Sequence, residues 1–175
     1  FIGGFQHPPN TDAVLWYAQE VLPRVRQRLP GVPIYIVGSK VPATIRALAA
    51  PDFVVTGYVP DVAPFFTGCR LSVAPLRYGA GVKGKVNLAM SYGLPVVATS
   101  PAVEGMHLVP GEDVMVADDP EQFAAAIERV YRDEPLWQRL SAGGIENIRR
   151  HFSRAVARQA LDELFALVDA RNPRK

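Results

Sequence analysis

The chain has 175 residues, of which 49% are hydrophobic and 21% charged, and its formal net charge at pH 7 is +2. That length is enough for one compact domain with a buried core and short for two. The small net charge gives no electrostatic basis for a nucleic-acid partner, and no apolar run is long enough to cross a membrane. We therefore expect a single soluble domain.

Two features concern the origin of the chain. Its single cysteine, Cys69, rules out an internal disulfide and is typical of a reducing compartment. The sequence begins at Phe1, without an initiator methionine and inside an apparent strand. We therefore expect it to be a piece of a longer protein.

Short β-branched runs alternate with segments of helical period, which is the pattern of βαβ units and a parallel sheet. Several runs are apolar throughout, as expected when helices cover both faces of a sheet. The predicted strands are residues 1–5, 34–37, 53–56, 71–74, 95–98 and 114–116. The predicted fold is a three-layer, doubly wound parallel α/β domain of the Rossmann-like kind over residues 1–170, with a tail at 171–175.

The helices follow from apolar spacing and end signals. A helix over residues 15–29 is predicted behind Asn10 as N-cap, with a kink or restart at Pro23. Short helices are predicted over 42–49 and 62–66, and a longer one over 83–92 that Gly93 ends.

In the last third, Asp119 is predicted to cap a helix that begins at Pro120, and another helix is predicted over 136–150. Ser153 is predicted to cap the last helix. Its apolar residues are expected to face the core: Val156, Ala160, Leu164, Leu167 and Val168.

The stretch "GAGVKGKV" at residues 79–86 lies between the predicted strand 71–74 and the predicted helix 83–92. A glycine-rich turn before a helix N-terminus lets backbone amides approach an anion, and the positive end of the helix favours negative charge there. Lys83 and Lys85 add formal positive charge at the same end. This stretch therefore predicts a phosphate-binding site.

Two known glycine patterns partly match the stretch. The P-loop pattern requires a hydroxyl residue for magnesium, and Val86 stands in that place. The dinucleotide pattern belongs in the first strand-to-helix turn and requires an acidic residue after the next strand, whereas "VVATS" has none. An NAD-binding domain remains as one alternative, and the three histidines show no metal-ligand spacing.

Four stretches resemble, in the same order, the C-terminal domain of the retaining glycosyltransferases with the GT-B fold, in the large family four. They are "FIGGFQHPPNTDAVLWYAQEVLPRVRQRLPGVPIYIVGS", "VVTGYVPDVAPFF", "GAGVKGKVNLAMSYGLPVVAT" and "EGMHLVPGEDVMVADDPEQFAAAI". In that family the C-terminal domain binds a sugar nucleotide, the N-terminal domain binds the acceptor, and the sugar is transferred between them with retention of configuration.

The resemblance implies that this chain is the donor-binding part of a hexosyltransferase and is inactive alone. The implied ligands of the donor diphosphate are Gly4, Phe5, Gly79, Gly81, Lys83, Gly84 and Lys85. Lys83 and Lys85 are the implied catalytic residues, because positive charge stabilises the departing diphosphate. The implied base and ribose contacts are Tyr58, Val59 and Leu88, and the implied contacts of the donor sugar are Arg77 and Glu104.

The sequence departs from the family pattern at two positions. The family carries two glutamates eight positions apart, and Ala80 and Leu88 stand in their places. A leucine offers no acceptor to ribose hydroxyls. A second hypothesis is therefore a degenerate, non-catalytic domain of the same fold that acts as a binding or regulatory module.

The resemblance also implies the partners. It implies a nucleotide-sugar donor as substrate, an acceptor-binding domain elsewhere in the same protein, and no metal or other cofactor. It places the protein in polysaccharide biosynthesis, in the cytoplasm or at the inner face of the membrane through the part missing from this chain.

Overall fold

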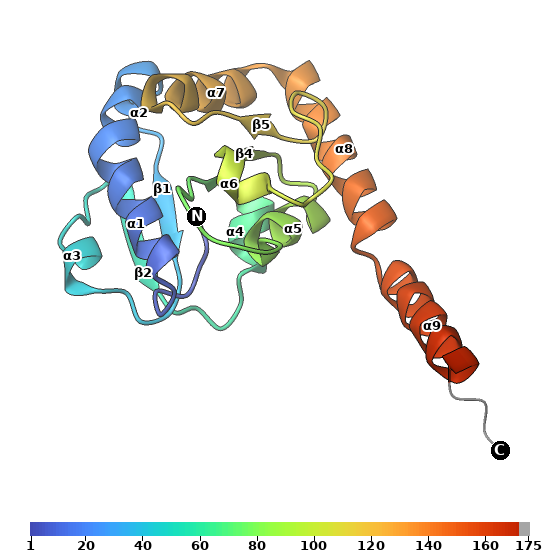
Figure 1. Cartoon of the computed structure of the whole chain (residues 1–175). Coiled ribbons are helices and arrows are strands. Elements are labelled where there is room, and N and C mark those ends of the chain that lie inside the picture. The colour runs from blue at the N-terminus through green and yellow to red at the C-terminus, as the bar shows by residue number, and fades with distance from the viewer. Residues whose placement is uncertain (172–175) are drawn as a thin grey trace.

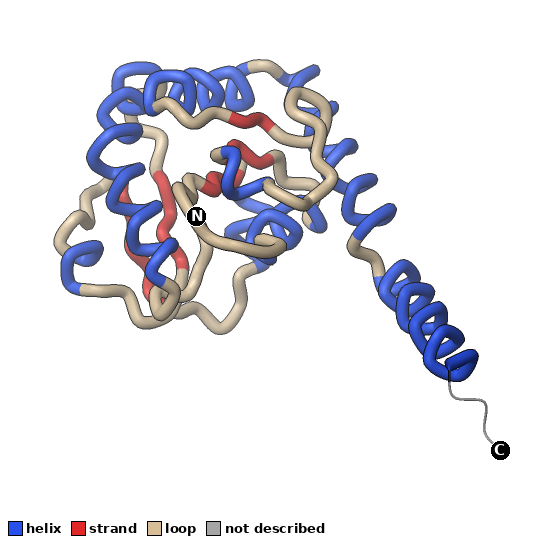
Figure 2. Tube along the Cα trace, viewed as in Figure 1, coloured by secondary structure: helices blue, strands red, loops and turns tan. Residues whose placement is uncertain are grey.

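Helices and short parallel strands alternate along the chain in the computed structural model, which describes residues 1–171 (Figure 1). Figure 2 shows the strands gathered in the middle of the molecule with helices around them. The elements are, in chain order, α1 Pro8–Trp16, η1 Tyr17–Val21, α2 Leu22–Arg28, β1 Ile34–Val37, α3 Ala43–Arg46, β2 Phe53–Gly57, α4 Ala63–Gly68, β3 Ser72–Ala74, α5 Gly84–Ser91, β4 Val96–Ala98, α6 Ser100–Val103, β5 Met115–Val116, α7 Pro120–Arg132, α8 Glu134–His151 and α9 Arg154–Arg171.

Every strand pair is parallel among the residues that the structure describes. β1 pairs with β2, and β3, β4 and β5 form a second sheet in that order. A cavity of about 300 Å³ is lined by Phe1 and Ile2, by residues of β1 and by residues of β3. The parallel α/β class predicted from the sequence is confirmed, with the sheet divided into two parts.

The first predicted strand is shorter than expected. Ile2 forms a single parallel bridge with Val37, and the Gly3 amide donates to the Val37 carbonyl at 2.9 Å. Beyond Ile2 no further bridge is formed, although the Phe5 amide still donates to the Ser39 carbonyl at 3.0 Å. The carbonyl of Gly4 accepts from the side chain of Asn10 at 2.7 Å and from the His7 amide at 3.3 Å, which begins a turn. The predicted strand over residues 1–5 is therefore reduced to a single bridge at Ile2 with hydrogen bonds to residues 35–39 on either side of it, and a turn begins at Gly4.

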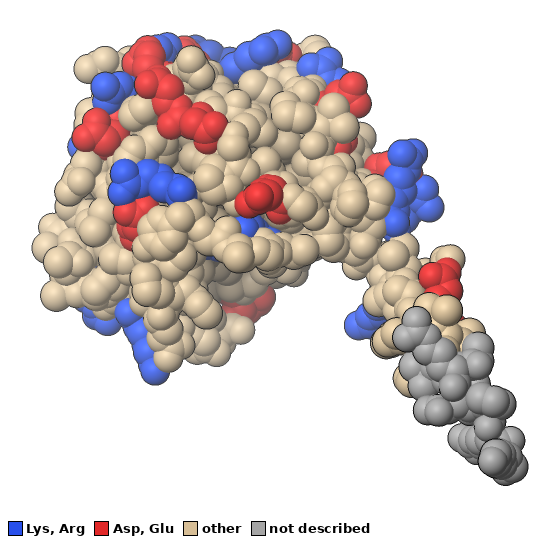
Figure 3. All heavy atoms as spheres, viewed as in Figure 1, with Lys and Arg blue, Asp and Glu red and all other residues tan. Residues whose placement is uncertain are grey.

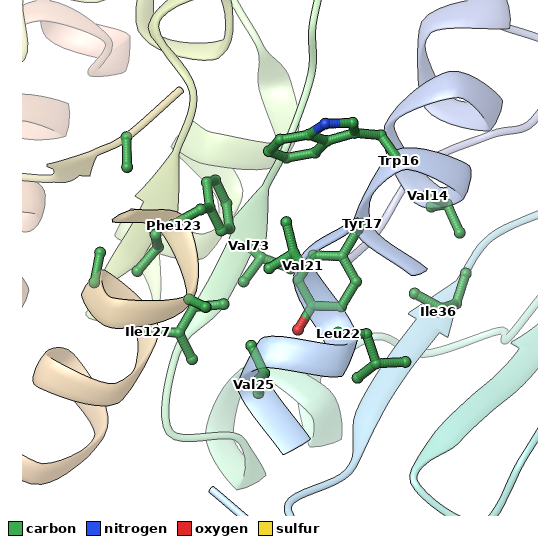
Figure 4. Close-up of a cluster of buried hydrophobic side chains, with 14 of the residues drawn as sticks. Val14, Trp16, Tyr17, Val21, Leu22, Val25, Ile36, Val73, Phe123 and Ile127 are labelled. Carbon is green, nitrogen blue, oxygen red and sulfur yellow. The ribbon is translucent and has the colours of Figure 1, made fainter. Parts of the chain in front are cut away.

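Two groups of apolar side chains form the core. In the first, Trp16 and Tyr17 meet Phe123 of α7 edge to face, with ring centroids 5.8 and 6.4 Å apart (Figure 4). In the second, Val86 and Met90 of α5 pack with residues of β3 and β4. Helix α2 packs on α7 and α5 packs on α8, so helices cover the strands in layers.

The first helix begins earlier than the sequence suggested. It starts at Pro8, with His7 as an extended N-cap and Asn10 inside the first turn. The prediction that Asn10 is the N-cap is wrong, because Pro8 and Pro9 suit the first helical positions, where no N–H is needed. The predicted restart at Pro23 is confirmed. The π-helical turn η1 ends at Val21, and Pro23, which has no N–H to donate, lies in the first turn of the new helix α2.

The later helices agree with the sequence at their starts and differ at the end. Asp119 caps α7 by accepting from the amides of Glu121 and Gln122, as predicted. Helix α9 extends away from the body (Figure 1), and Leu164 is 54% exposed.

The prediction that the apolar residues of α9 face inward is therefore wrong for Ala160, Leu164 and Leu167, which are all exposed. The chain turns away from the body between α8 and α9, so no other described element packs against the apolar face of α9. Val168 lies beyond the residues whose side chains are described, and α9 runs into the predicted tail, of which 172–175 lie outside the described residues.

The close approach of Gly38 to the first residues of the chain gives a stability prediction. A Cβ at Gly38 would lie 1.8 Å from the Gly3 carbonyl oxygen. Gly38→Ala should therefore lower the free energy of unfolding by about 2 to 4 kcal/mol, because backbone atoms must move apart. Chemical denaturation measures this change. Gly68→Ala is the control, since nothing lies within 4 Å of a Cβ there; equal losses in both variants would contradict the argument.

Candidate functional site

The predicted site residues follow the carboxyl ends of parallel strands. Gly4 follows the segment paired with β1, Tyr58 follows β2, Arg77 and the glycine-rich loop follow β3, and Glu104 follows β4 and α6. In open parallel sheets these ends share one edge, where ligands bind. The topology therefore places the predicted residues along a single edge of the molecule.

The glycine-rich loop connects β3 to α5 in a conformation that depends on glycine. Gly79 and Gly81 have φ angles of 129° and 74°, a region that residues with a side chain rarely adopt. Lys83 is the N-cap of α5, and its ammonium donates to the carbonyls of Gly79 and Gly81 at 3.1 and 2.6 Å. The loop is thus closed on itself by one of the two predicted lysines.

Two helix starts flank the loop. Helix α5 begins at Gly84, directly after Lys83, and a Cβ at Gly79 would lie 3.7 Å from Cγ of Pro9 in the first turn of α1. The first amides of a helix have no partner within the helix, and its N-terminus carries partial positive charge. Pro8 and Pro9 at the start of α1 carry no N–H, so of the two helix starts only that of α5 offers free backbone amides to an anion.

Lys85 lies in the first turn of α5, where its side chain is half-buried. Its ammonium donates to Oδ1 of Asn10 and lies 4.2 Å from the centre of the Phe1 ring. Burial, and to a smaller degree the positive charge of Lys83, lowers the pKa of the Lys85 ammonium to about 7. Near neutral pH the Lys85 side chain is therefore present in both its protonated and its neutral form.

The turn after the first strand joins the same group through Asn10. The carbonyl of Gly4 accepts from Nδ2 of Asn10, and Oδ1 of the same amide binds Lys85. The side chain of Phe5 lies in the core, and its amide donates to the Ser39 carbonyl at 3.0 Å. Gly4 is thus linked to Lys85 through the side chain of Asn10, whereas Phe5 makes no hydrogen bond to this group.

The remaining predicted residues lie outside this group of contacts. Tyr58, next to Val59 in the loop after β2, is 74% exposed, and Glu104 is the exposed C-cap of α6. Leu88, one turn after Gly84, is half-buried and packs against the second core group. Arg77 makes a two-bond ion pair with Asp12 of α1, with Nε 2.9 Å from Oδ2.

Two polar residues with structural contacts in this region were not predicted as site residues. Asn10 bridges the first turn and Lys85, although its place near a helix start suggested only a cap. Asp118 accepts from the amide of Ser100 at 2.7 Å and from its hydroxyl at 2.6 Å, which joins the ends of β4 and β5. No sequence motif known for this kind of site includes an asparagine at the position of Asn10, so the sequence alone did not identify its contact with Lys85.

The surface around the site carries charges of both signs. Figure 3 shows Lys and Arg side chains interspersed with Asp and Glu on the face in view, with much uncharged surface between them. Among residues 1–171, no helix has the length and apolar character to span a membrane, and no three metal-ligand side chains form a cluster.

Comparison with known sequences finds one family and several relatives. Residues 1–133 match the family described as Glycosyl transferases group 1. The lipopolysaccharide core biosynthesis glycosyltransferase LpsE of Rhizobium meliloti (strain 1021) is 30% identical over 148 residues, which are 79% of this chain and 43% of LpsE. An uncharacterized 44.6 kDa protein in the cps region of Klebsiella pneumoniae is 28% identical over 136 residues, covering 73% of this chain and 35% of that protein. The chain thus spans less than half the length of these relatives.

Solved structures share the fold. HepE of Anabaena, solved in complex with UDP, has a TM-score of 0.72 at 16% identity, over 87% of this chain and 46% of that one. The C-terminal domain of LpcC, a glycosyl transferase group 1 family protein of Francisella tularensis, has a TM-score of 0.66 at 13% identity, over 85% and 82% of the two chains. At these identities the likeness is one of fold.

The lowered pKa of Lys85 predicts how stability depends on pH. In the unfolded chain the pKa of lysine is 10.5, so between about pH 7 and 10.5 the unfolded state binds more protons than the folded state. The free energy of unfolding should therefore rise with pH in this window, by about 3 to 5 kcal/mol in total from Lys85. Lys85→Met removes this contribution.

Chemical denaturation at pH 6.5, 8 and 9.5 measures the effect as the difference between the wild type and Lys85→Met. Lys83→Met is the graded comparison, because removing the neighbouring positive charge should raise the pKa of Lys85 and weaken the dependence. A difference between the wild type and Lys85→Met that stays constant with pH would contradict the prediction.

Proposed function

Because the chain belongs to the Glycosyl transferases group 1 family, we propose that it binds the diphosphate of a nucleotide-sugar donor at the loop 79–85 and forms the donor half of a retaining hexosyltransferase. The observation that carries this proposal is the pair of lysines at a glycine-rich helix start. Lys85 is held half-buried there with its pKa lowered to about 7. A positive charge in such a place is unfavourable without an anion.

The chemistry of transfer explains the need for positive charge. When the bond between the anomeric carbon and the diphosphate oxygen breaks, its electron pair stays on the diphosphate. Lys83, Lys85 and the start of α5 would stabilise the negative charge that develops there. This requires no metal ion, so the proposed domain works on the donor as its only small-molecule ligand.

The other contacts are assigned by their place along the same edge. Tyr58 and Val59 would meet the base, with the exposed ring of Tyr58 offering a flat apolar face. Arg77 and Glu104 would meet the donor sugar, and Asp12 already fixes the guanidinium of Arg77. Selectivity for the base and the sugar would then come from the loops that carry these residues, and binding affinity from the diphosphate site.

The acceptor is proposed to bind a domain outside this chain. The chain spans 43% of LpsE, so a second half of similar size is available in such a protein. We expect the 175 residues alone to transfer no sugar, because a cleft needs both walls. A cytoplasmic role in building surface polysaccharide is proposed from the stated role of LpsE in lipopolysaccharide core synthesis.

A specific observation favours a second candidate function. Ala80 and Leu88 replace the two glutamates of the family pattern, and Leu88 packs against the core instead of facing a ligand with a polar group. A domain that binds a nucleotide weakly and regulates a complete enzyme is consistent with this. It differs from the first proposal in predicting no transfer by the full-length protein.

Calorimetric titration with UDP, GDP and ADP, beside the matching nucleosides, tests the diphosphate site. Lys85→Ala should weaken binding of the diphosphate that the wild type prefers by about 1.5 to 3 kcal/mol, the range for a hydrogen bond to a charged group, and leave nucleoside binding unchanged. The loss should shrink above pH 8, where Lys85 of the wild type is itself largely neutral.

Arg150→Ala, on α8, is the control for a lost positive charge far from the loop. Equal losses for nucleoside and diphosphate would mean that Lys85→Ala only disturbed the fold. Failure of the wild type to bind any of the three diphosphates would overturn the proposed function.

Leu88→Glu tests whether ribose lies against α5. A carboxylate at this position could accept from two ribose hydroxyls, so binding of ribonucleotides should tighten relative to deoxyribonucleotides by about 1 to 3 kcal/mol. Leu88 is half-buried, so the variant is also checked by thermal unfolding, since an unpaired carboxylate in the core is destabilising. A folded variant with no gain in ribose discrimination would contradict this placement of the ribose.

A further inference from the structure

Asn10 is one of four polar residues that are buried in the described part of the chain, and both ends of its side-chain amide make hydrogen bonds. It is 7% exposed in the first turn of α1. Nδ2 donates to the Gly4 carbonyl at 2.7 Å, and Oδ1 accepts from the ammonium of Lys85. An asparagine near a helix start usually caps the free amides of its own helix, but here His7 is the N-cap and no side chain caps. The side chain of Asn10 thus serves two other segments.

Asn10 is the hydrogen-bond acceptor of the Lys85 ammonium, and the other groups around this ammonium are apolar or positive. The ammonium faces the Phe1 ring on one side, and a Cβ on Gly3 would lie 3.0 Å from it. Of the charged groups in the described residues, the Lys83 ammonium acts on it, and that group is also positive. Asp12, one residue beyond Thr11 on α1, is held by Arg77. Within residues 1–171 no carboxylate pairs with Lys85.

We propose that Asn10 is the positioning residue of the diphosphate site: its amide holds the Lys85 ammonium against the Gly3-Gly4 turn without neutralising it. This inference rests on the proposed function, since it takes Lys85 as the group that meets the diphosphate. A carboxylate in the place of Asn10 would hold the ammonium as well, but it would cancel the charge and repel phosphate oxygens. A neutral amide occupies one of the three N–H donors of Lys85 and leaves two for a ligand.

Gly3 contributes the space for this arrangement. A Cβ there would lie 2.8 Å from Nδ2 of Asn10 and 3.0 Å from the ammonium of Lys85. Any side chain at Gly3 would therefore displace one of the two partners. The Gly3-Gly4 pair, Asn10 and Lys85 form one unit, assembled from the first turn of the chain, α1 and α5.

The protonation of Lys85, followed by NMR of its side chain, tests the contact directly. The chain contains only four lysines, so the signal of Lys85 is assigned by its absence in Lys85→Met. Asn10→Asp should raise the pKa of Lys85 by about one unit or more, and Asn10→Leu, which removes the acceptor, should lower it. Thr11→Val, at the next residue of α1, is the control and should leave it unchanged. Unchanged pKa values in both Asn10 variants would overturn the inference.

A double-mutant cycle separates positioning from a structural role. Asn10→Leu should weaken binding of the preferred nucleoside diphosphate about tenfold in the wild-type background and little in the Lys85→Met background. A residue that only supports the fold would weaken binding equally in both, and that result would overturn the inference. Gly3→Ala should behave like Asn10→Leu in the cycle, so the inference stays testable if Asn10→Leu fails to fold.

The two proposals fail in different ways. If the wild type binds none of UDP, GDP and ADP, the proposed function fails, and the pKa of Lys85 in the Asn10 variants still decides whether Asn10 holds the ammonium. If the wild type binds a diphosphate and the cycle shows equal losses in both backgrounds, the positioning role fails while the proposed function stands.

Discussion

The positive charge of Lys85 at the start of α5 is the constraint around which this edge of the molecule is arranged. Both burial and the partial positive charge of a helix N-terminus oppose an ammonium there, and Lys83 adds a second like charge. A structural role alone would be served better by an apolar residue. Local features that conflict with stability are expected where a protein binds a ligand, and an anion would relieve all three costs at once.

The parallel sheet supplies the geometry that makes this possible. Loops far apart in the sequence follow strands that run in one direction, so the turn after Gly3, the loop after β2 and the glycine-rich loop reach the same edge. Asn10 and Asp12, both on α1, then tie two of these loops together through Lys85 and Arg77. The first helix therefore does more than cover the sheet: its first turns link the glycine-rich loop to the first turn of the chain.

The two departures from the family pattern, Ala80 and Leu88, leave the glycines and both lysines of the proposed phosphate site in place. Leu88, the proposed ribose contact, offers no acceptor to a hydroxyl. Phosphate recognition depends on backbone shape and charge, and ribose recognition on one or two side-chain acceptors. A side-chain acceptor can be replaced without disturbing the fold, and Leu88 packs against the second core group.

The sequence by itself determined the parallel α/β class, most helix positions, the cap at Asp119, the restart at Pro23 and the glycine-rich loop before α5. These depend on local chemistry: apolar period, proline geometry, a carboxylate before free amides, and glycine where φ is positive. The tertiary structure alone decided that only Ile2 of residues 1–5 forms a bridge with β1, that Asn10 holds Lys85 instead of capping a helix, and that α9 extends from the body. Each of these depends on a partner distant in the sequence or on the lack of one, and a pattern along the chain carries no record of such a partner.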